Sequence, residues 1–538
     1  MASCVERATW RAEASWYVRD VKIHEMSALE LRRALNDRTL SSVDIVEALL
    51  ARRRSVDPKI GAFAIDLGAS AREAAVRCDA ERKSDPSRCG PLHGLPISVK
   101  ENIEIAGTAC TLGVEKRRGI VSQNDAVTVK LAKAAGAIVI GKTNIPQTLL
   151  AMESTNFVYG TTKNPWALDR TPGGSSGGES AAIASGQSVL GIGTDIGGSV
   201  RIPAAYTGIA AIKPSLHRWS NRGSVGLLLG QEIVRSQIGP LARTTEEVAF
   251  FLRALDTPMH APFDPEVAPF PIGDPDEVSL KGMRIGVYED DGFFTPCVTS
   301  KRAVREAAEA LERAGAILVP FTPPRARDHY AMLACAVSAD GLQTLEGWLG
   351  DDEVIAPVAL NLRLINTPKR ARQVLARALE FMGESRIART LGQVGERTVA
   401  EYWKLTWDRT SLLRAEHDKW AETKIDALIC PATATPAPHH GTTADFTPAA
   451  AYTTRYNVLN LPAGVCPATT VRENETDRPE RSDRLDKRAV AIQRGSAGLP
   501  IGVQVVGRPY REDVVLRVML EVERSARSRG ELPPLPLG

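Results

Sequence analysis

Two glycine-rich turns in the first half of the chain present serine residues, which suggests hydroxyl chemistry. The first turn is Gly173–Gly178 and contains Ser175 and Ser176, and the second is Asp195–Ser199. Glycine carries no side chain and can take positive φ, so a hydroxyl beside it stays open to a ligand. A serine in such a turn can attack a carbonyl carbon.

The second turn also offers a place for the negative charge that this attack would create. Residues 188–195 read as a short buried strand, and the chain from Ser199 onward reads as the first turns of a helix. We expect the amides of Ile196, Gly197, Gly198 and Ser199 to be unpaired there, as amides are at helix N-termini. Removing one such donor typically raises a reaction barrier by about 2.7–4 kcal/mol. Nucleophile and oxyanion hole would then come from one loop.

The base for this hydroxyl must come from another part of the chain. Neither turn contains any of the eight histidines. A lysine can take the proton when burial lowers its pKa, because desolvation disfavours the charged form. Lys100 ends the apolar run Gly94–Lys100, the only short upstream strand that delivers an amine at its tip. On spacing alone, a surface lysine at a strand end is the alternative.

Three motifs that contain these residues resemble the amidase signature family: Pro91–Glu101, Gly173–Glu179 and Thr194–Pro203. The resemblance implies a Ser-cisSer-Lys triad with Lys100 as base, Ser175 as bridging serine and Ser199 as nucleophile. It also implies a cis peptide bond before Ser175. A proton would pass from Ser199 through Ser175 to Lys100 and return to the leaving nitrogen. No cofactor and no metal are expected.

The same resemblance assigns supporting residues. Ser176 would make a positioning hydrogen bond, and Leu149 and Met152 match the family's substrate-binding region. An apolar helix of core residues explains Leu149 and Met152 nearly as well. Asp195 and Arg201, which flank the nucleophile, are expected to orient the loop.

Later motifs look like the fatty acid amide hydrolase branch in particular: Lys213–Pro214, Gly230–Gln231, Gly239–Arg243, Arg284–Glu289, Leu461–Val465 and Gly498–Gln504. This implies cleavage of the C–N bond of N-acyl amines with an apolar acyl chain, through an acyl-enzyme. Two alternatives stay open: an amidotransferase A-like subunit that releases ammonia from glutamine, and an amidase or esterase for aryl amides or carbamates. A non-enzymatic binding protein is disfavoured by the complete triad. The chain departs from the branch in lacking a membrane-spanning N-terminal helix and a strongly apolar cap over the acyl channel.

The elements that must position these residues alternate between strand and helix from Gly90 onward, which is typical of the α/β class. The resemblance implies the amidase signature fold, a large mixed β-sheet covered by helices on both faces. Residues 1–85 read as an N-terminal helical arm, opened by a capping box at Ser27–Glu30, and residues 86–538 as the catalytic domain. We expect residues 329–420 to be mostly helical and the charged insert Arg472–Arg488 to be a solvent loop.

Two familiar patterns are misleading. Gly136–Thr143 satisfies the phosphate-loop pattern G-x-x-x-x-G-K-T, but its middle residues are apolar and strand-forming, and Pro146 interrupts the helix that should follow. Gly174–Gly178 spells the G-x-S-x-G elbow of α/β-hydrolases, yet it follows a loop. We therefore expect neither nucleotide binding nor Ser176 as nucleophile.

Composition and charge limit the classes of binding partner and the cellular compartment that we expect. A formal net charge of +3 over 538 residues gives no reason to propose nucleic acid. The cysteines form no C-x-x-C pair, which suits free thiols in a reducing compartment, and no signal peptide or transmembrane stretch is expected, so we predict a cytoplasmic protein. His439–His440 reads as a solvated loop and not as a metal pair.

Residues 369–382 form a basic amphipathic helix that can be read in two ways. The helix packs on its own domain, or it is a lid that touches membranes or amphiphilic substrates. The first reading is favoured, and a peripheral membrane contact through this segment stays open, as does a homodimer.

Overall fold

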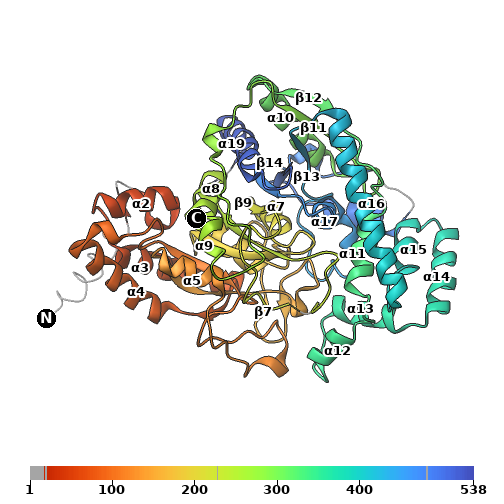
Figure 1. Ribbon diagram of the computed structural model, residues 1–538, viewed down its shortest axis with the longest axis horizontal. Coiled ribbons are helices and arrows are strands. Elements are labelled where there is room, and N and C mark those ends of the chain that lie inside the picture. The colour runs from red at the N-terminus through yellow and green to blue at the C-terminus, as the bar shows by residue number, and fades with distance from the viewer. Residues whose placement is uncertain (1–16, 19–20, 227, 480–482, 533, 538) are drawn as a thin grey trace.

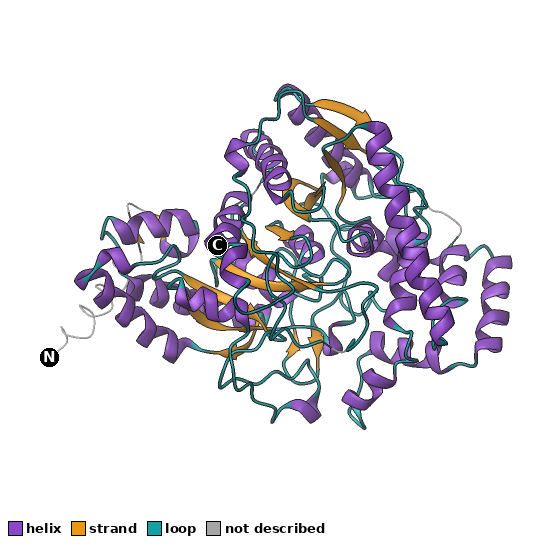
Figure 2. Cartoon of the chain, in the orientation of Figure 1, coloured by secondary structure: helices purple, strands orange, loops and turns teal. Residues whose placement is uncertain are grey.

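A computed structural model describes residues 17–18, 21–226, 228–479, 483–532 and 534–537, and a large mixed sheet runs through it (Figure 1, Figure 2). The described residues form an 11-stranded sheet in the order β12-β11-β13-β15-β14-β9-β10-β8-β4-β5-β3. In that order the strands are Ile317–Pro320, Arg284–Val287, Ala427–Pro431, Pro500–Gly507, Ala463–Thr470, Ala210–Lys213, Gln237–Ala242, Leu190–Asp195, Pro96–Lys100, Ile138–Thr143 and Phe63–Asp66.

Strand β4 lies parallel to both of its neighbours, β5 and β8. Parallel neighbours end at the same edge of a sheet, so Lys100, Thr143 and Asp195, the last residues of these strands, meet there. Strand β10 pairs antiparallel with β8 on the other side. Every residue of β4, β8 and β10 is buried, so both faces of this part of the sheet are covered. The expected α/β class with a large mixed sheet is confirmed.

Short helices follow the two serine turns. Helix α6 (Gly177–Ala184) begins directly after Ser176, and α7 (Arg201–Thr207) begins two residues after Ser199. Helix α6 packs against β8, and α7 packs against α6 and β9. Each helix therefore ties one serine turn to the sheet.

The N-terminal part contains the predicted helices α2 (Ala28–Asn36), α3 (Ser42–Ile60) and α4 (Gly68–Ser84). The capping box at Ser27–Glu30 is confirmed, since Ser27 Oγ accepts from Glu30 N and Glu30 accepts from Ser27 N. Between α3 and α4 the chain adds strand β3 to the edge of the sheet, antiparallel to β5. The arm is thus joined to the main sheet, and its division from the rest at residue 85 stays a prediction.

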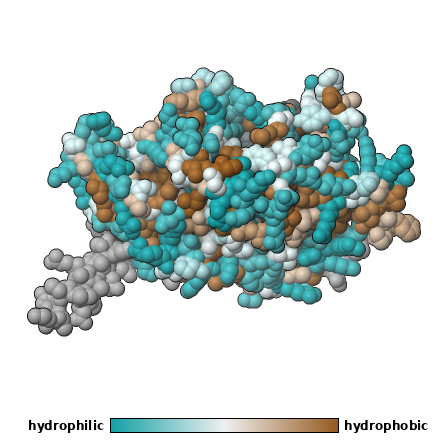
Figure 3. All heavy atoms as spheres, turned by 90° about the horizontal axis from the view of Figure 1, so that it is seen from below, coloured by the Kyte–Doolittle hydropathy of each residue, from teal (hydrophilic) through white to brown (hydrophobic). Residues whose placement is uncertain are grey.

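The segment expected to be helical contains six helices, α11 to α16: His329–Val337, Gln343–Leu349, Ala356–Asn366, Lys369–Phe381, Ser385–Leu391 and Val399–Thr423. Leu379 of α14 is buried against α15, whereas Val374, Leu375 and Phe381 are exposed. Apolar side chains are visible at the end of the molecule that carries α14 and α15 (Figure 3). None of the described helices has the length and apolarity needed to cross a bilayer.

The expectation of a solvent loop at Arg472–Arg488 is wrong for part of this insert. Helix α18 (Arg484–Gln493) begins inside this insert, and Glu475, Arg478 and Asp486 are buried. Arg302 pairs with Glu475 at 2.7 Å, and Arg386 pairs with Asp486 at 3.0 Å. Because both arginines come from distant parts of the chain, local charge density could not reveal them.

Candidate active site

Lys100 lies at the end of β4 with its amine inside the protein. Its side chain is fully buried, and its Nζ is 2.7 Å from Ser175 Oγ, 2.8 Å from Thr194 Oγ1 and 3.3 Å from Thr194 O. Burial lowers the pKa of Lys100 from 10.5 to about 7, although Asp195 and Glu179 favour the charged form. An amine that is half neutral at neutral pH can accept a proton.

The three oxygen atoms around Lys100 suit both of its protonation states. Thr194 O can only accept a hydrogen bond, whereas the hydroxyls of Ser175 and Thr194 can rotate to accept or donate. A charged amine donates to all three, and a neutral amine donates to two and accepts from the third. In the neutral state the Ser175 hydroxyl can therefore point its hydrogen at the lysine lone pair.

Ser175 follows a cis peptide bond, Gly174–Ser175, as the family resemblance implied. Gly174 has no room for a side chain, since a Cβ there would lie 2.5 Å from Ala151 O and 2.9 Å from Glu153 N. Ser154 holds the turn from the other side, because its Oγ donates to Gly173 O and accepts from Gly177 N, both at 3.1 Å. The turn is thus anchored on both sides of the Ser175 hydroxyl.

The two serine turns contact each other directly. Ser176 N donates to Ser199 O at 3.1 Å, and Ser176 Oγ donates to Thr194 O at 3.4 Å. Ser199 is 9% exposed, and within the described residues its Oγ makes no hydrogen bond to Ser175 Oγ or to any other group. Catalytic hydrogen bonds are often long before substrate binds. The arrangement brings Lys100 and Ser175 into contact and places Ser199 on the adjoining turn.

The amides of the second turn are not alike. Asp195 accepts from Gly198 N at 2.8 Å and from Val200 N at 3.2 Å. The expectation of four unpaired amides is therefore wrong for Gly198, because a carboxylate three residues earlier folds back onto it. Within the described chain the amides of Ile196, Gly197 and Ser199 have no partner, and Ile196 and Gly197 are half-buried.

Asp195 itself is held as a carboxylate. Burial would raise its pKa, but Arg201 donates to both of its oxygens at 3.0 Å and Asn457 donates at 2.8 Å, so its pKa lies well below the ordinary value. This agrees with the orienting role expected of Asp195 and Arg201.

Two polar residues near Lys100 were not singled out from the sequence. Thr194 contacts its amine, and Glu179 lies buried behind it, bonded to Ser98 Oγ and, at 2.6 Å, to Thr143 Oγ1. Burial raises the pKa of Glu179 to about 7. Glu179 is the last residue of the motif Gly173–Glu179, and Thr194 is the first residue of the motif Thr194–Pro203. The sequence does not reveal that these polar side chains are buried beside Lys100; only the structure does.

The residues expected to line a substrate pocket lie in different surroundings. Leu149 is half-buried beside an apolar cluster that contains Ala151, Leu345 and Ile355, whereas Met152 is buried in the main core. The segment forms a 3-10 turn at Gln147–Leu149 and not the apolar helix considered as the alternative.

His439 and His440 do not form a purely solvated loop. His440 Nδ1 lies 2.9 Å from Glu153 Oε1, and His439 Nδ1 lies 3.1 Å from Asp169 Oδ2. The carboxylates come from distant positions, so local sequence could not show them. Glu153 also accepts hydrogen bonds from Gly441 N and Thr443 Oγ1, so both of its carboxylate oxygens have hydrogen-bond partners.

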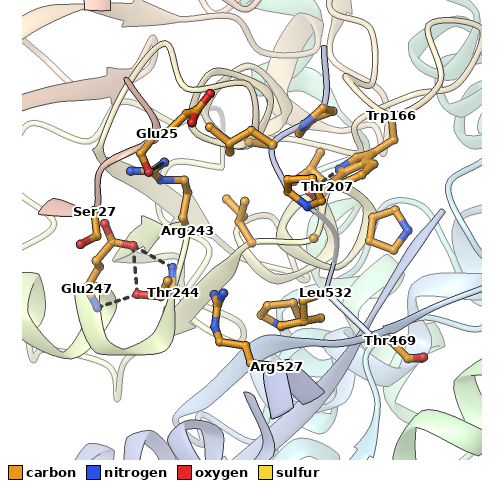
Figure 4. Close-up of a pocket in the computed structure, with 18 of the residues that line it drawn as sticks. Glu25, Ser27, Trp166, Thr207, Arg243, Thr244, Glu247, Thr469, Arg527 and Leu532 are labelled. Atoms are coloured by element: carbon orange, nitrogen blue, oxygen red, sulfur yellow. Dashed lines mark hydrogen bonds between the residues drawn. The ribbon is translucent and has the colours of Figure 1, made fainter. Parts of the chain in front are cut away.

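A cavity of about 480 Å³ is lined by residues from several distant segments of the chain (Figure 4). Its lining includes Ala184 at the end of α6 and Thr207 at the end of α7, together with Ser27 and Leu532. The serine turns precede the opposite ends of the same two helices. Lys100, Ser175 and Ser199 do not contribute to its walls.

Comparison with known proteins gives consistent results. Residues 44–516 match the family model described as "Amidase". The chain is 36% identical to fatty-acid amide hydrolase 1 of Sus scrofa over 458 residues, which is 83% of this chain and 78% of that protein. It is 30% identical to a glutamyl-tRNA(Gln) amidotransferase subunit of Roseiflexus sp. (strain RS-1) over 529 residues, which is 96% of this chain and 99% of that protein.

A solved structure of a fatty acid amide hydrolase superposes with a TM-score of 0.80 at 24% identity and covers 98% of this chain and 91% of its own. The structure of a 6-aminohexanoate cyclic dimer hydrolase complexed with substrate gives a TM-score of 0.74 at 24% identity, covering 96% of this chain and 100% of its own. These structural matches agree on the fold.

Proposed function

This chain belongs to the amidase family and hydrolyses amide bonds, and from that premise we propose that it cleaves the C–N bond of N-acyl amines with Ser199 as nucleophile. The observation that carries the proposal is the contact of 2.7 Å between Ser175 Oγ and an amine whose pKa burial lowers to about 7. A base of that pKa works best near neutral pH.

In the proposed reaction, neutral Lys100 accepts a proton from Ser175 while Ser175 accepts one from Ser199. Ser199 Oγ bonds to the carbonyl carbon, and the carbonyl oxygen becomes an oxyanion held by the free amides of the second turn. Lys100 returns a proton through Ser175 to the leaving nitrogen, the C–N bond breaks, and the amine departs. Water then attacks the acyl-Ser199 ester through the same relay and releases the carboxylic acid.

An apolar acyl chain is the substrate feature that we propose next. The similarity to fatty-acid amide hydrolase 1 over 83% of the chain supports it. So does the apolar cluster beside Leu149, which continues into Leu345, Leu349 and Ile355 of the helical segment. Exposed Val374, Leu375 and Phe381 on α14 support contact with amphiphilic substrates or a membrane surface.

Release of ammonia from glutamine is the second candidate function. The similarity to the amidotransferase relative extends over 96% of this chain at 30% identity. The two candidates differ in substrate and not in the proposed triad, so assays of the products distinguish them.

Active-site labelling tests the proposal. A fluorophosphonate probe reacts with activated serines, and peptide mass mapping should place the label on Ser199, with no label in Ser199→Ala. Label on Ser176 or on another residue would overturn the assignment. Amine release from N-acyl amines of increasing acyl length, measured beside ammonia release from glutamine, decides the substrate class: glutamine as the better substrate would overturn the first candidate.

A further inference from the structure

Helix α17 (Ala451–Val458) comes from the last fifth of the chain, yet it reaches the turn that contains Ser199. Every one of its residues is buried. Thr453 Oγ1 donates to Gly197 O at 3.1 Å, and Thr454 Oγ1 donates to the same oxygen at 3.0 Å. The carbonyl of Gly197 thus accepts hydrogen bonds from two consecutive hydroxyls.

The two threonines are not equivalent donors. Thr453 Oγ1 is also 2.9 Å from Ala450 O, and a hydroxyl has one hydrogen to give. Thr454 Oγ1 makes a hydrogen bond only to Gly197 O within the described residues. Thr454 is therefore the dedicated donor, and Thr453 shares its hydrogen between two carbonyls.

These hydroxyls determine the orientation of one peptide plane. The carbonyl of Gly197 and the amide of Gly198 belong to the same planar group and point in opposite directions. The carbonyl is held by the threonines of α17, and the amide donates to Asp195 Oδ1 at 2.8 Å. Hydrogen bonds thus hold this peptide plane at both ends. They therefore also restrict the orientation of the free amides of Gly197 and Ser199, which belong to the two neighbouring peptide planes.

Asp195 is tied to the same helix. Asn457 Nδ2 donates to Asp195 Oδ1 at 2.8 Å, Arg201 Nη2 donates to Asn457 Oδ1 at 2.6 Å, and Arg201 Nη1 donates to Thr453 O at 2.9 Å. Helix α17 also leaves no space around the turn, since a Cβ on Gly198 would meet Thr453. The carboxylate and the carbonyl that shape the turn are both anchored on α17.

We propose that Thr454, assisted by Thr453, is a positioning residue for the amides that hold the oxyanion. The inference rests on the proposed function, because it needs Ser199 as nucleophile. Among the described residues, the threonine hydroxyls make no hydrogen bond to Lys100, Ser175 or Ser199; they act through the Gly197 carbonyl. Their effect is confined to the step in which negative charge develops, so it falls on kcat and not on KM.

The test compares Thr454→Val, which keeps the shape and loses the hydroxyl, with Thr454→Ser, which keeps the hydroxyl. We expect Thr454→Val to lower kcat about tenfold, as loss of one hydrogen bond in a preorganised site does, with KM within about twofold of the wild type. Thr454→Ser should restore kcat to within about twofold of the wild type. Thr128→Val is the matched control, because Thr128 is a fully buried threonine whose Oγ1 donates to Ser220 O at 3.2 Å.

Rates are expressed per fluorophosphonate-labelled Ser199, so that misfolded protein does not count. An unchanged kcat in Thr454→Val, or a serine variant no better than valine, would overturn the inference. If Thr454→Val does not fold, Thr454→Ala against Thr454→Ser gives the same comparison. A kcat loss in Thr128→Val as large as that in Thr454→Val would also overturn it. Failure of the wild type to label at Ser199 would instead overturn the proposed function.

Discussion

Replacing Lys100 by alanine should produce a loss of activity that depends steeply on pH. With a pKa of about 7, roughly half of the Lys100 amines are neutral at pH 7, whereas a lysine at its ordinary 10.5 would be neutral in roughly one molecule in three thousand. Burial thus increases the fraction of Lys100 that is neutral at pH 7 more than a thousandfold. In the wild type, kcat/KM should rise about tenfold per pH unit below 7 and level off above it.

A positioned base contributes about 10²–10⁴-fold to such a reaction, so Lys100→Ala should lose about 10³-fold at pH 7. In the variant, hydroxide from solution replaces the amine, and its concentration rises tenfold with each pH unit. The wild type only doubles between pH 7 and its plateau, so the ratio of the two rates should shrink to about twentyfold at pH 9. The assay is kcat/KM for an N-acyl amine from pH 6 to 10, normalised to labelled Ser199.

Lys142→Met is the matched control, because Lys142 is a buried lysine whose Nζ donates to Ala109 O at 2.7 Å and makes no hydrogen bond to a serine. Its ratio to the wild type should not change with pH. A constant ratio for Lys100→Ala across this range would refute the reasoning, as would a wild-type inflexion near 10.5.

Three further predictions follow from the site and from α14. Ser175→Ala should lower kcat/KM by about 10²-fold or more, since Lys100 then loses the hydroxyl proposed to pass protons between it and Ser199; kcat/KM within threefold of the wild type would contradict the relay. Glu179→Gln should move the inflexion of the pH–rate profile to lower pH, because Glu179 as an anion favours the charged form of Lys100; a profile that stays in place or moves upward would show that this charge does not act on the amine. In liposome flotation, the double variant Val374→Asp, Leu375→Asp should float less than the wild type, and equal flotation would exclude a membrane contact through α14.

Much of the site could be anticipated because its motifs are local. The apolar run that ends in Lys100 is strand β4, and the turn that contains Ser175 lies against its tip. The false phosphate loop was recognisable for the same reason, since Ile138–Thr143 is a buried strand. Periodicity and turn chemistry carry this kind of information.

What escaped prediction depends on contacts between distant positions. Glu179 comes near Lys100 only when α6 packs on the sheet, and Thr194 only when β8 lies beside β4. Nothing in the local sequence of α17 singles out its two threonines, which gain a partner only through folding. The ion pairs of the charged insert, such as Arg302 with Glu475, likewise join segments far apart in the chain.

The crowding around the glycines of the site has a consequence for how the protein can vary. A methyl group on Gly174 would collide with Ala151 O at 2.5 Å, and one on Gly193 would lie 2.9 Å from Ser176 Oγ. At Gly119, Gly226 and Gly347 the same methyl would meet nothing within 4 Å, and none of these three requires positive φ. In a saturation library, alanine should therefore be tolerated at Gly119, Gly226 and Gly347 and rejected at Gly174 and Gly193. The positions that reject alanine would show where the serine turns leave no volume for a methyl group, without any assay of catalysis.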